Sequence, residues 1–157
     1  TMYAPDEEKY SHSKEKMESQ ISSLYGGRIA EIMAFGKNKI TTGASNDYKV
    51  ATQYAEQMIK HYGLGEEDDL LTLGYKDNSY NNSLSEKDKE SMNNILKENY
   101  EEASKILKEN ASLLLCCTKA LLKYDTIDEE QIKQVMDGID IAEEQEIPDE
   151  YLKFLKA

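Results

Sequence analysis

The sequence has 157 residues, the length of a single domain that can bury a core without disulfides or a structural metal. Its 19 Lys and Arg residues against 31 Asp and Glu residues give a net charge of −12, which argues against nucleic acid as a partner and against attraction to an anionic membrane surface. No apolar run approaches the roughly 20 residues that a membrane-spanning helix needs, so we expect these residues to be soluble.

The first long pattern is helical and covers residues 13–35. Gly26 and Gly27 lie inside it, where each costs about 1 kcal/mol relative to alanine. A second helix packed against the backbone would best explain the pair, and either the later chain or a segment before Thr1 could supply it. Before this helix we expect at most a strand remnant, at residues 1–3. The apolar face consists of Met17, Ile21, Leu24, Tyr25, Ile29, Ile32 and Met33.

A loop at residues 40–47 leads into a second predicted helix at residues 46–62. Gly43 offers an unusual turn, Ser45 and Asn46 offer capping side chains, and Asp47 places a carboxylate in the first helical turn. The helix dipole favours an anion at that position. The stretch can therefore hold a cation, provided that other ligands join Asp47.

The remainder of the chain also has helical patterns. Residues 76–84 are expected to form a flexible loop, and Ser85 with Asp88 predicts the capped start of a helical region at residues 85–138. Asn110 is expected to interrupt this region and cap the next helix. A capping box at Thr126-Ile127-Asp128-Glu129 is expected to open a short helix that stops at Gly138.

These patterns predict a mainly α fold, a helical bundle. We expect residues 1–75 to form one part, residues 85–138 a second, and residues 139–157 an acidic tail or a short helix.

Most reactive residue types are better explained by packing or solvation than by catalysis. His12 and His61 are too far apart for a helical zinc-binding pair. Cys116 and Cys117 are adjacent on a Leu-rich helical pattern, which suits packing better than nucleophilic catalysis and does not suit a mutual disulfide. The absence of a disulfide framework fits a reducing, intracellular compartment. The acidic runs lack the spacing of a calcium loop.

What remains is Asp47 together with Glu31 on the long helix. From composition alone, Asp47 is more often an ordinary acid of a helix start, and Glu31 a solvated helix residue. The residues by themselves leave both explanations open.

Several motifs, taken together, resemble the peptidase domain of the FtsH family of membrane-anchored, hexameric, ATP-dependent zinc metalloproteases. The resemblance covers residues 1–136. It rests on Leu24-Tyr25-Gly26-Gly27-Arg28-Ile29-Ala30-Glu31, Phe35-Gly36, Thr41-Thr42-Gly43-Ala44-Ser45-Asn46-Asp47, Ala51-Thr52 and Tyr62-Gly63, and on the later Glu98-Asn99-Tyr100, Ala120-Leu121-Leu122-Lys123-Tyr124 and Thr126-Ile127.

The resemblance implies a zinc site. In the family, two histidines of a His-Glu-x-x-His helix and the aspartate that corresponds to Asp47 hold the metal. Glu31 would then lie beside the site and orient a histidine ligand. Gly26, Gly27 and Gly43 would be structural residues near it, the first two allowing close approach of the zinc-binding helix. The family often has a second acid after Glu31, where this chain has Ile32, so the resemblance assigns no role to that position.

No His-Glu-x-x-His occurs in these 157 residues, and Thr1 is not an initiator methionine. The resemblance therefore implies the C-terminal part of a peptidase domain, inactive by itself because both histidine ligands and the general-base glutamate are absent. In the intact parent that glutamate would activate a zinc-bound water. A separate ATPase domain would bind ATP and Mg²⁺, and an anchor would hold the homo-hexamer in the membrane, with the peptidase on the cytoplasmic, matrix or stromal side. Its substrates would be unfolded or membrane proteins.

Two other interpretations stay open. The chain could act as a non-catalytic helical oligomerisation module, or it could belong to a pseudoprotease whose own gene lacks the histidines. The encoded residues upstream of Thr1 would separate the pseudoprotease from the protease.

Overall fold

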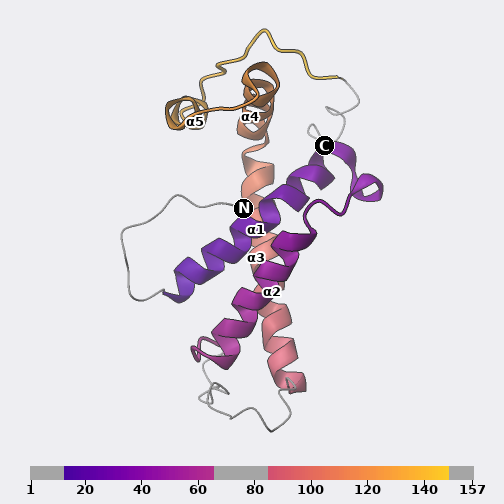
Figure 1. Cartoon of the computed structure of the whole chain (residues 1–157), viewed down its shortest axis with the longest axis vertical. Helices are drawn as coiled ribbons and strands as arrows, with labels where there is room; N and C mark the ends of the chain where they lie inside the picture. The colour runs from indigo at the N-terminus through magenta and orange to yellow at the C-terminus, as the bar shows by residue number, and fades with distance from the viewer. Residues whose placement is uncertain (1–12, 66–84, 149–157) are drawn as a thin grey trace. The chain divides into compact units, whose positions relative to one another are not determined.

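A computed structural model of the chain describes residues 13–65 and 85–148. These residues form five α-helices and no strand (Figure 1), which confirms the expected mainly α fold. The predicted strand remnant at residues 1–3, the predicted loop at residues 76–84 and the end of the predicted tail, residues 149–157, lie outside the described part. The elements are α1 (Lys14–Phe35), a 3-10 turn η1 (Lys37–Lys39), α2 (Ser45–Lys60), α3 (Glu86–Glu109), α4 (Ala111–Tyr124) and α5 (Glu129–Met136).

The chain divides into two compact units. Unit 1 comprises Thr1–Gly26 and Thr42–Ala103, and unit 2 comprises Gly27–Thr41 and Ser104–Ala157. The division falls within α1 and within α3, so each of these helices contributes to both units. The three-part division expected from the sequence stays a prediction.

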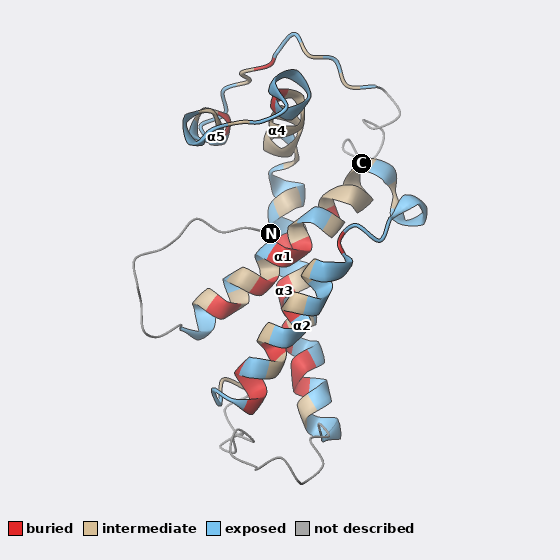
Figure 2. Ribbon diagram, in the orientation of Figure 1, coloured by how far each residue is buried: buried red, intermediate tan, exposed pale blue. Residues whose placement is uncertain are grey.

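Unit 1 is held together by an apolar core that α1, α2 and α3 share. Ile21 and Met58 are completely buried and Leu24 is 2% exposed, and each such side chain contributes about 1.5–3 kcal/mol on burial. Figure 2 shows the buried positions along the three helices. The buried apolar residues of this unit are Met17, Ile21, Leu24, Tyr25, Ala44, Ala51, Ala55, Met58, Ile59, Met92, Ile95 and Ala103.

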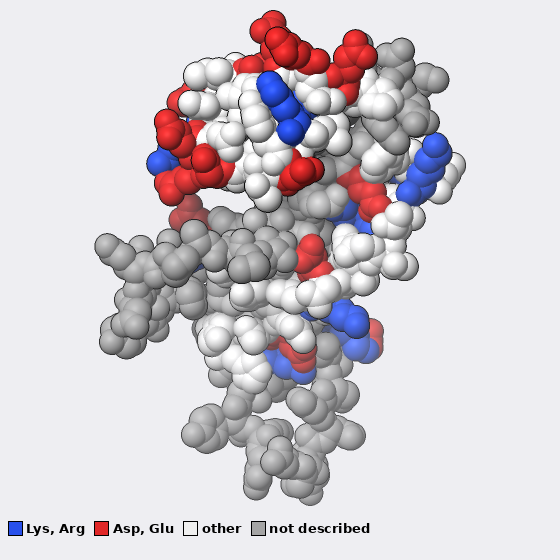
Figure 3. Space-filling view, turned by 45° about the horizontal axis from the view of Figure 1, so that its top comes forward, with Lys and Arg blue, Asp and Glu red and all other residues white. Residues whose placement is uncertain are grey.

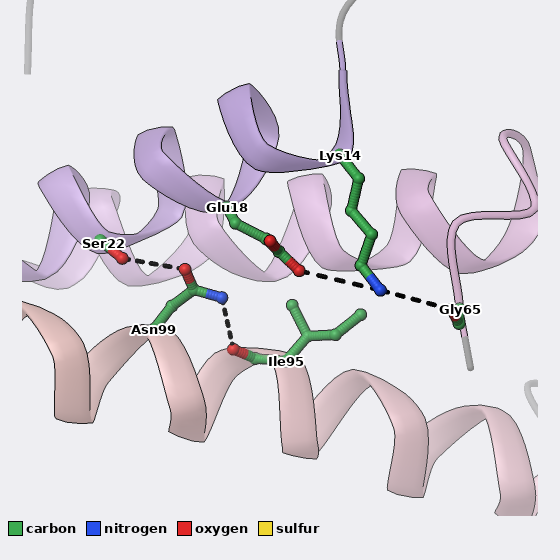
Figure 4. A network of polar contacts seen from close by, with 6 residues as sticks. All are labelled: Lys14, Glu18, Ser22, Gly65, Ile95 and Asn99. Atoms are coloured by element: carbon green, nitrogen blue, oxygen red, sulfur yellow. Dashed lines mark hydrogen bonds and ion pairs between the residues drawn. The ribbon is translucent and has the colours of Figure 1, made fainter. Parts of the chain in front are cut away.

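A polar network joins α1 to α3 inside unit 1 (Figure 4). The Ser22 hydroxyl donates to Asn99 Oδ1 at 2.8 Å, and Asn99 Nδ2 donates to the Ile95 carbonyl at 2.7 Å. Asn99 is only 7% exposed, and no buried side-chain nitrogen or oxygen in the described part lacks a hydrogen-bond partner. Because a buried amide is costly unless it is satisfied, this network favours one alignment of α1 against α3.

Unit 2 contains α4 and α5, which pack against each other. Ala120, Val135 and Ala142 are completely buried. Lys119 Nζ lies 2.8 Å from Asp140 Oδ2, and the Tyr124 hydroxyl donates to the Ile141 carbonyl at 3.2 Å. The described part of the predicted tail, residues 139–148, contains turns, and these bonds fix its first residues to α4.

The stretch of unit 2 from residue 125 to residue 146 is strongly acidic. Figure 3 shows the carboxylates on one face of the molecule. Between residues 125 and 146 the one basic residue is Lys133, and such a surface would repel a polyanion. The acidic residues of this stretch are Asp125, Asp128, Glu129, Glu130, Asp137, Asp140, Glu143, Glu144 and Glu146.

The predicted capping box at Ser85 is confirmed, because the Ser85 hydroxyl accepts from the Asp88 amide and the Asp88 carboxylate accepts from the Ser85 amide. The box predicted at Thr126 is wrong by two residues. The true N-cap of α5 is Asp128, whose carboxylate accepts from the Gln131 amide while the Gln131 side chain accepts from the Asp128 amide. Thr126 is used instead in the turn after α4, where its amide donates to the Tyr124 carbonyl.

Two other helix ends were predicted with mixed success. Asn110 does interrupt the helical region and does occupy the N-cap position of α4, but its side chain donates to the Ile106 carbonyl of α3 and makes no cap bond to α4. Gly138 does end α5: its φ is 85°, its amide donates to the Val135 carbonyl, and the Ile139 amide donates to the Gln134 carbonyl. This pair of bonds is the Schellman pattern that suits glycine.

Candidate functional site

Asp47 lies in the first turn of α2, as the sequence predicts. Ala44 precedes the helix, the Ser45 amide donates to the Thr42 carbonyl at 3.0 Å, and the Tyr48 amide donates to the Ala44 carbonyl at 3.2 Å. The Asp47 residue is half-buried. Its carboxylate is therefore carried at the positive end of the α2 dipole, a position that stabilises an anion.

Two expectations about this turn are wrong. Neither Ser45 nor Asn46 is the N-cap: Ala44 occupies that position, and no side-chain cap bond is present. Positive φ angles among the described glycines occur at Gly36, Gly63 and Gly138, so the unusual conformation expected at Gly43 is not found. The chain enters α2 through an ordinary turn closed by a backbone hydrogen bond, and such a turn needs no left-handed residue.

Three tyrosines of unit 1 meet at this end of α2. The Tyr25 ring of α1 lies 5.0 Å from the Tyr48 ring at 74° and 5.3 Å from the Tyr100 ring of α3 at 75°, both edge-to-face arrangements. Burial of Tyr25, together with the neighbouring Tyr48 phenol, raises its pKa to about 12. The sequence analysis assigned Tyr25 only to the apolar face of the first helix and did not predict its contact with Tyr48. The one available signal was that an aromatic residue, Tyr48, directly follows Asp47.

Glu31 belongs to unit 2 and has two partners there. Its Oε1 accepts from the Thr41 amide at 2.8 Å, and its Oε2 accepts from Arg28 Nη1 at 2.8 Å. The hydrogen bonding from Thr41, and secondarily the Arg28 charge, hold the pKa of Glu31 below its usual value. Glu31 therefore ties the end of the connector to α1. A carboxylate oxygen has more than one lone pair, so these bonds leave room for another donor.

The glycine pair of α1 has an open surface. A Cβ built on Gly26 or on Gly27 meets nothing within 4 Å. Among the described residues, none packs against the pair as closely as the sequence led us to expect, and the identity of the helix that the pair predicts stays a prediction.

The other candidate ligands do not form a metal site in the described residues. His61 is exposed, and His12 lies outside the described part. Cys116 and Cys117 are half-buried free thiols, and burial followed by the neighbouring Cys116 raises the pKa of Cys117, which disfavours the thiolate. Residues 13–65 and 85–148 contain no group of three His, Cys, Asp or Glu residues that could hold a metal ion. By themselves, they do not fit a complete zinc site.

Comparison with known proteins identifies the family. Residues 1–135 match the profile of Peptidase family M41. The chain belongs to this family. It is 36% identical over 148 residues to the ATP-dependent zinc metalloprotease FtsH of Haemophilus influenzae, covering 87% of this chain and 23% of that protein. It is 32% identical over 155 residues to the FtsH of Rickettsia bellii, covering 92% of this chain and 24% of that protein, and 52% identical over 80 residues to the FtsH of Clostridium perfringens, covering 51% and 11%.

The chain thus spans about a quarter or less of the length of these M41 relatives. No helix in the described part is both long enough and apolar enough to cross a membrane.

Proposed function

We propose that this chain is part of the peptidase domain of an ATP-dependent zinc endopeptidase and that Asp47 supplies one zinc ligand. The M41 match over residues 1–135 carries the proposal, because it includes the motif that ends at Asp47. The parent would be membrane-anchored and hexameric, with ATP and Mg²⁺ bound in a separate domain, and would degrade unfolded or misassembled proteins processively. The names of the FtsH relatives support the ATP and zinc parts of this proposal.

The remaining site residues take supporting roles in this proposal. Glu31 would orient a histidine ligand through the acceptor capacity left beside its bonds to Arg28 and Thr41. The open surface at Gly26 and Gly27 would receive the helix that carries the histidines. Residues 1–75 would belong to the catalytic part and residues 85–138 to a helical part that makes contacts between subunits.

The 157 residues alone contain only two histidines and no His-Glu-x-x-His. We therefore expect the isolated chain to bind no stoichiometric zinc in a calorimetric titration and to leave casein uncleaved. Tight 1:1 zinc binding with proteolysis would contradict this.

The role of Asp47 is tested in the protein extended by the residues encoded before Thr1. In that protein, Asp47→Asn should lower the zinc content, whereas the control Glu90→Gln, which changes an exposed acid, should not. If those encoded residues contain no His-Glu-x-x-His, the protease proposal fails and the pseudoprotease remains.

A second candidate is a non-catalytic helical module that assembles with copies of itself. Its support is the exposure of large apolar side chains in unit 2, which reaches 55% at Leu122, 62% at Met136 and 53% at Ile139. Sedimentation of the chain tests autonomous assembly. Concentration-dependent association that Leu122→Gln weakens would support it, and a monomer at high concentration would contradict it.

A further inference from the structure

We propose that Tyr25 is a positioning residue that fixes the first turn of α2, and with it Asp47, without any help from a metal. This rests on the proposed function, because that function gives Asp47 its role. The three tyrosines and Asp47 all belong to unit 1.

The Tyr25 ring packs between two helices, α2 and α3. Its side chain is 4% exposed, and it follows Leu24, which is 2% exposed, in the buried stripe of α1. On one side the ring meets Tyr100 of α3, and on the other it meets Tyr48. An aromatic ring has few rotatable bonds, so a ring clamped on two sides holds its neighbours at little entropic cost.

The start of α2 depends on such an external support. It lacks a side-chain cap, and Ser45 and Asn46 are exposed. A helix terminus of this kind frays unless tertiary contacts hold it. Tyr48 is 38% exposed, and its edge-to-face contact with Tyr25 connects the first turn to the buried core. Because Tyr48 directly follows Asp47, fixing Tyr48 also fixes the backbone that aims the carboxylate.

A purely structural role of Tyr25 would act on all of α2 alike, whereas a positioning role acts on its first turn. The Ser45 and Tyr48 amides report on that turn through their bonds to the Thr42 and Ala44 carbonyls, and the Met58 amide reports on the buried last turn of α2. Amide hydrogen exchange measured by NMR separates local opening of the turn from unfolding of the unit.

The test compares the full chain with three variants. In Tyr25→Leu, which keeps an apolar side chain but removes the ring, we expect exchange at Ser45 and Tyr48 to accelerate roughly two- to tenfold while Met58 changes little. Tyr25→Phe should restore the wild-type rates, because it keeps the ring. The matched control Ile21→Val perturbs the same buried stripe one turn before Tyr25 and leaves all three rings in place, so it should affect Ser45, Tyr48 and Met58 by similar factors.

Unchanged exchange at Ser45 and Tyr48 in Tyr25→Leu, or equal acceleration along all of α2, would overturn the proposal. If Tyr25→Leu does not fold, Tyr100→Leu removes the opposite support of the same ring and should give the same local acceleration; unchanged rates there would overturn it as well. The readout needs no metal. Failure of the zinc measurements would therefore leave this result intact, and failure here would leave the ligand role of Asp47 to its own test.

Discussion

The bond between Ser22 and Asn99 provides the sharpest test of the fold of unit 1, because its two residues lie far apart in the sequence. Ser22→Ala leaves the buried Asn99 Oδ1 without this donor, which we expect to cost about 1–3 kcal/mol. Asn99→Ala removes that bond and the one to the Ile95 carbonyl, each worth about 0.5–1.5 kcal/mol net, together with the packing of a buried side chain. The expected loss is about 2–3 kcal/mol.

The double variant isolates the contact itself. If the two side chains are bonded, the losses should fail to add by about 1 kcal/mol, since the bond between Ser22 and Asn99 can be lost only once. Urea unfolding followed by circular dichroism measures the free energies of unfolding for the cycle. Ser19→Ala is the matched control, because Ser19 is an exposed residue of the same helix whose hydroxyl donates to the Glu15 carbonyl, so its loss should add to that of Asn99→Ala. Losses at Ser22 and Asn99 that add within about 0.3 kcal/mol would refute the hydrogen bond between these two side chains.

Three further predictions concern unit 2. Because the pKa of Glu31 is lowered, its carboxylate stabilises the folded state above pH 4.5, its usual pKa, and this stabilisation is lost as the pH falls through the folded-state pKa. Glu31→Gln should therefore lower the urea midpoint at neutral pH and match the wild type in acid. An equal difference in midpoint between variant and wild type at both pH values would contradict this. The mutual hydrogen bond of Lys119 and Asp140 raises the pKa of Lys119 and lowers that of Asp140, so the ion pair persists at every pH between the two pKa values. Asp140→Asn should therefore speed proteolysis of residues 139–148 near neutral pH. Unchanged cleavage would contradict this. Asp128→Ala should cost about 1 kcal/mol in thermal unfolding and Thr126→Ala almost nothing, and the reverse order would restore the capping box at Thr126.

The sequence predicted the helices well because their apolar residues recur at helical spacing. The long stripe of α1 is the clearest case: Met17, Ile21, Leu24, Tyr25 and Ile29 are all buried. The period also placed the end of α1, where Gly36 adopts a φ of 79° after Phe35. These features depend on residues close together in the chain, and they can therefore be predicted from a single sequence.

The helix starts were harder to predict, because several side chains compete for each cap. Both Thr126 and Asp128 can accept an amide bond, but Asp125 takes a φ of 60° at the end of α4, which draws Thr126 into a turn and leaves Asp128 to start α5. Asn110 likewise had two choices and bonds the carbonyl behind it. The choice depends on backbone angles that the residue types do not specify.

The partners of the candidate site were harder still, because they come from distant parts of the chain. The resemblance to a known family was needed to give Asp47 a function, since an acid in the first turn of a helix is usually structural. The bonds of Glu31 to Thr41 and the packing of Tyr100 on Tyr25 join residues that no local pattern connects. The zinc roles of Asp47 and Glu31 stay predictions.

The structure also changes how the motif around Asp47 is understood. Its polar residues looked like a self-contained helix start, yet Ser45 and Asn46 are exposed and do not cap α2. The dipole of α2 stabilises the Asp47 carboxylate by only about 0.3–1 kcal/mol, which favours its charge but does not fix its direction. Direction requires a contact that resists rotation of the first turn, and the edge-to-face contact between the Tyr25 and Tyr48 rings provides one. The geometry of the proposed ligand thus depends on the core of unit 1 as well as on the motif that carries it.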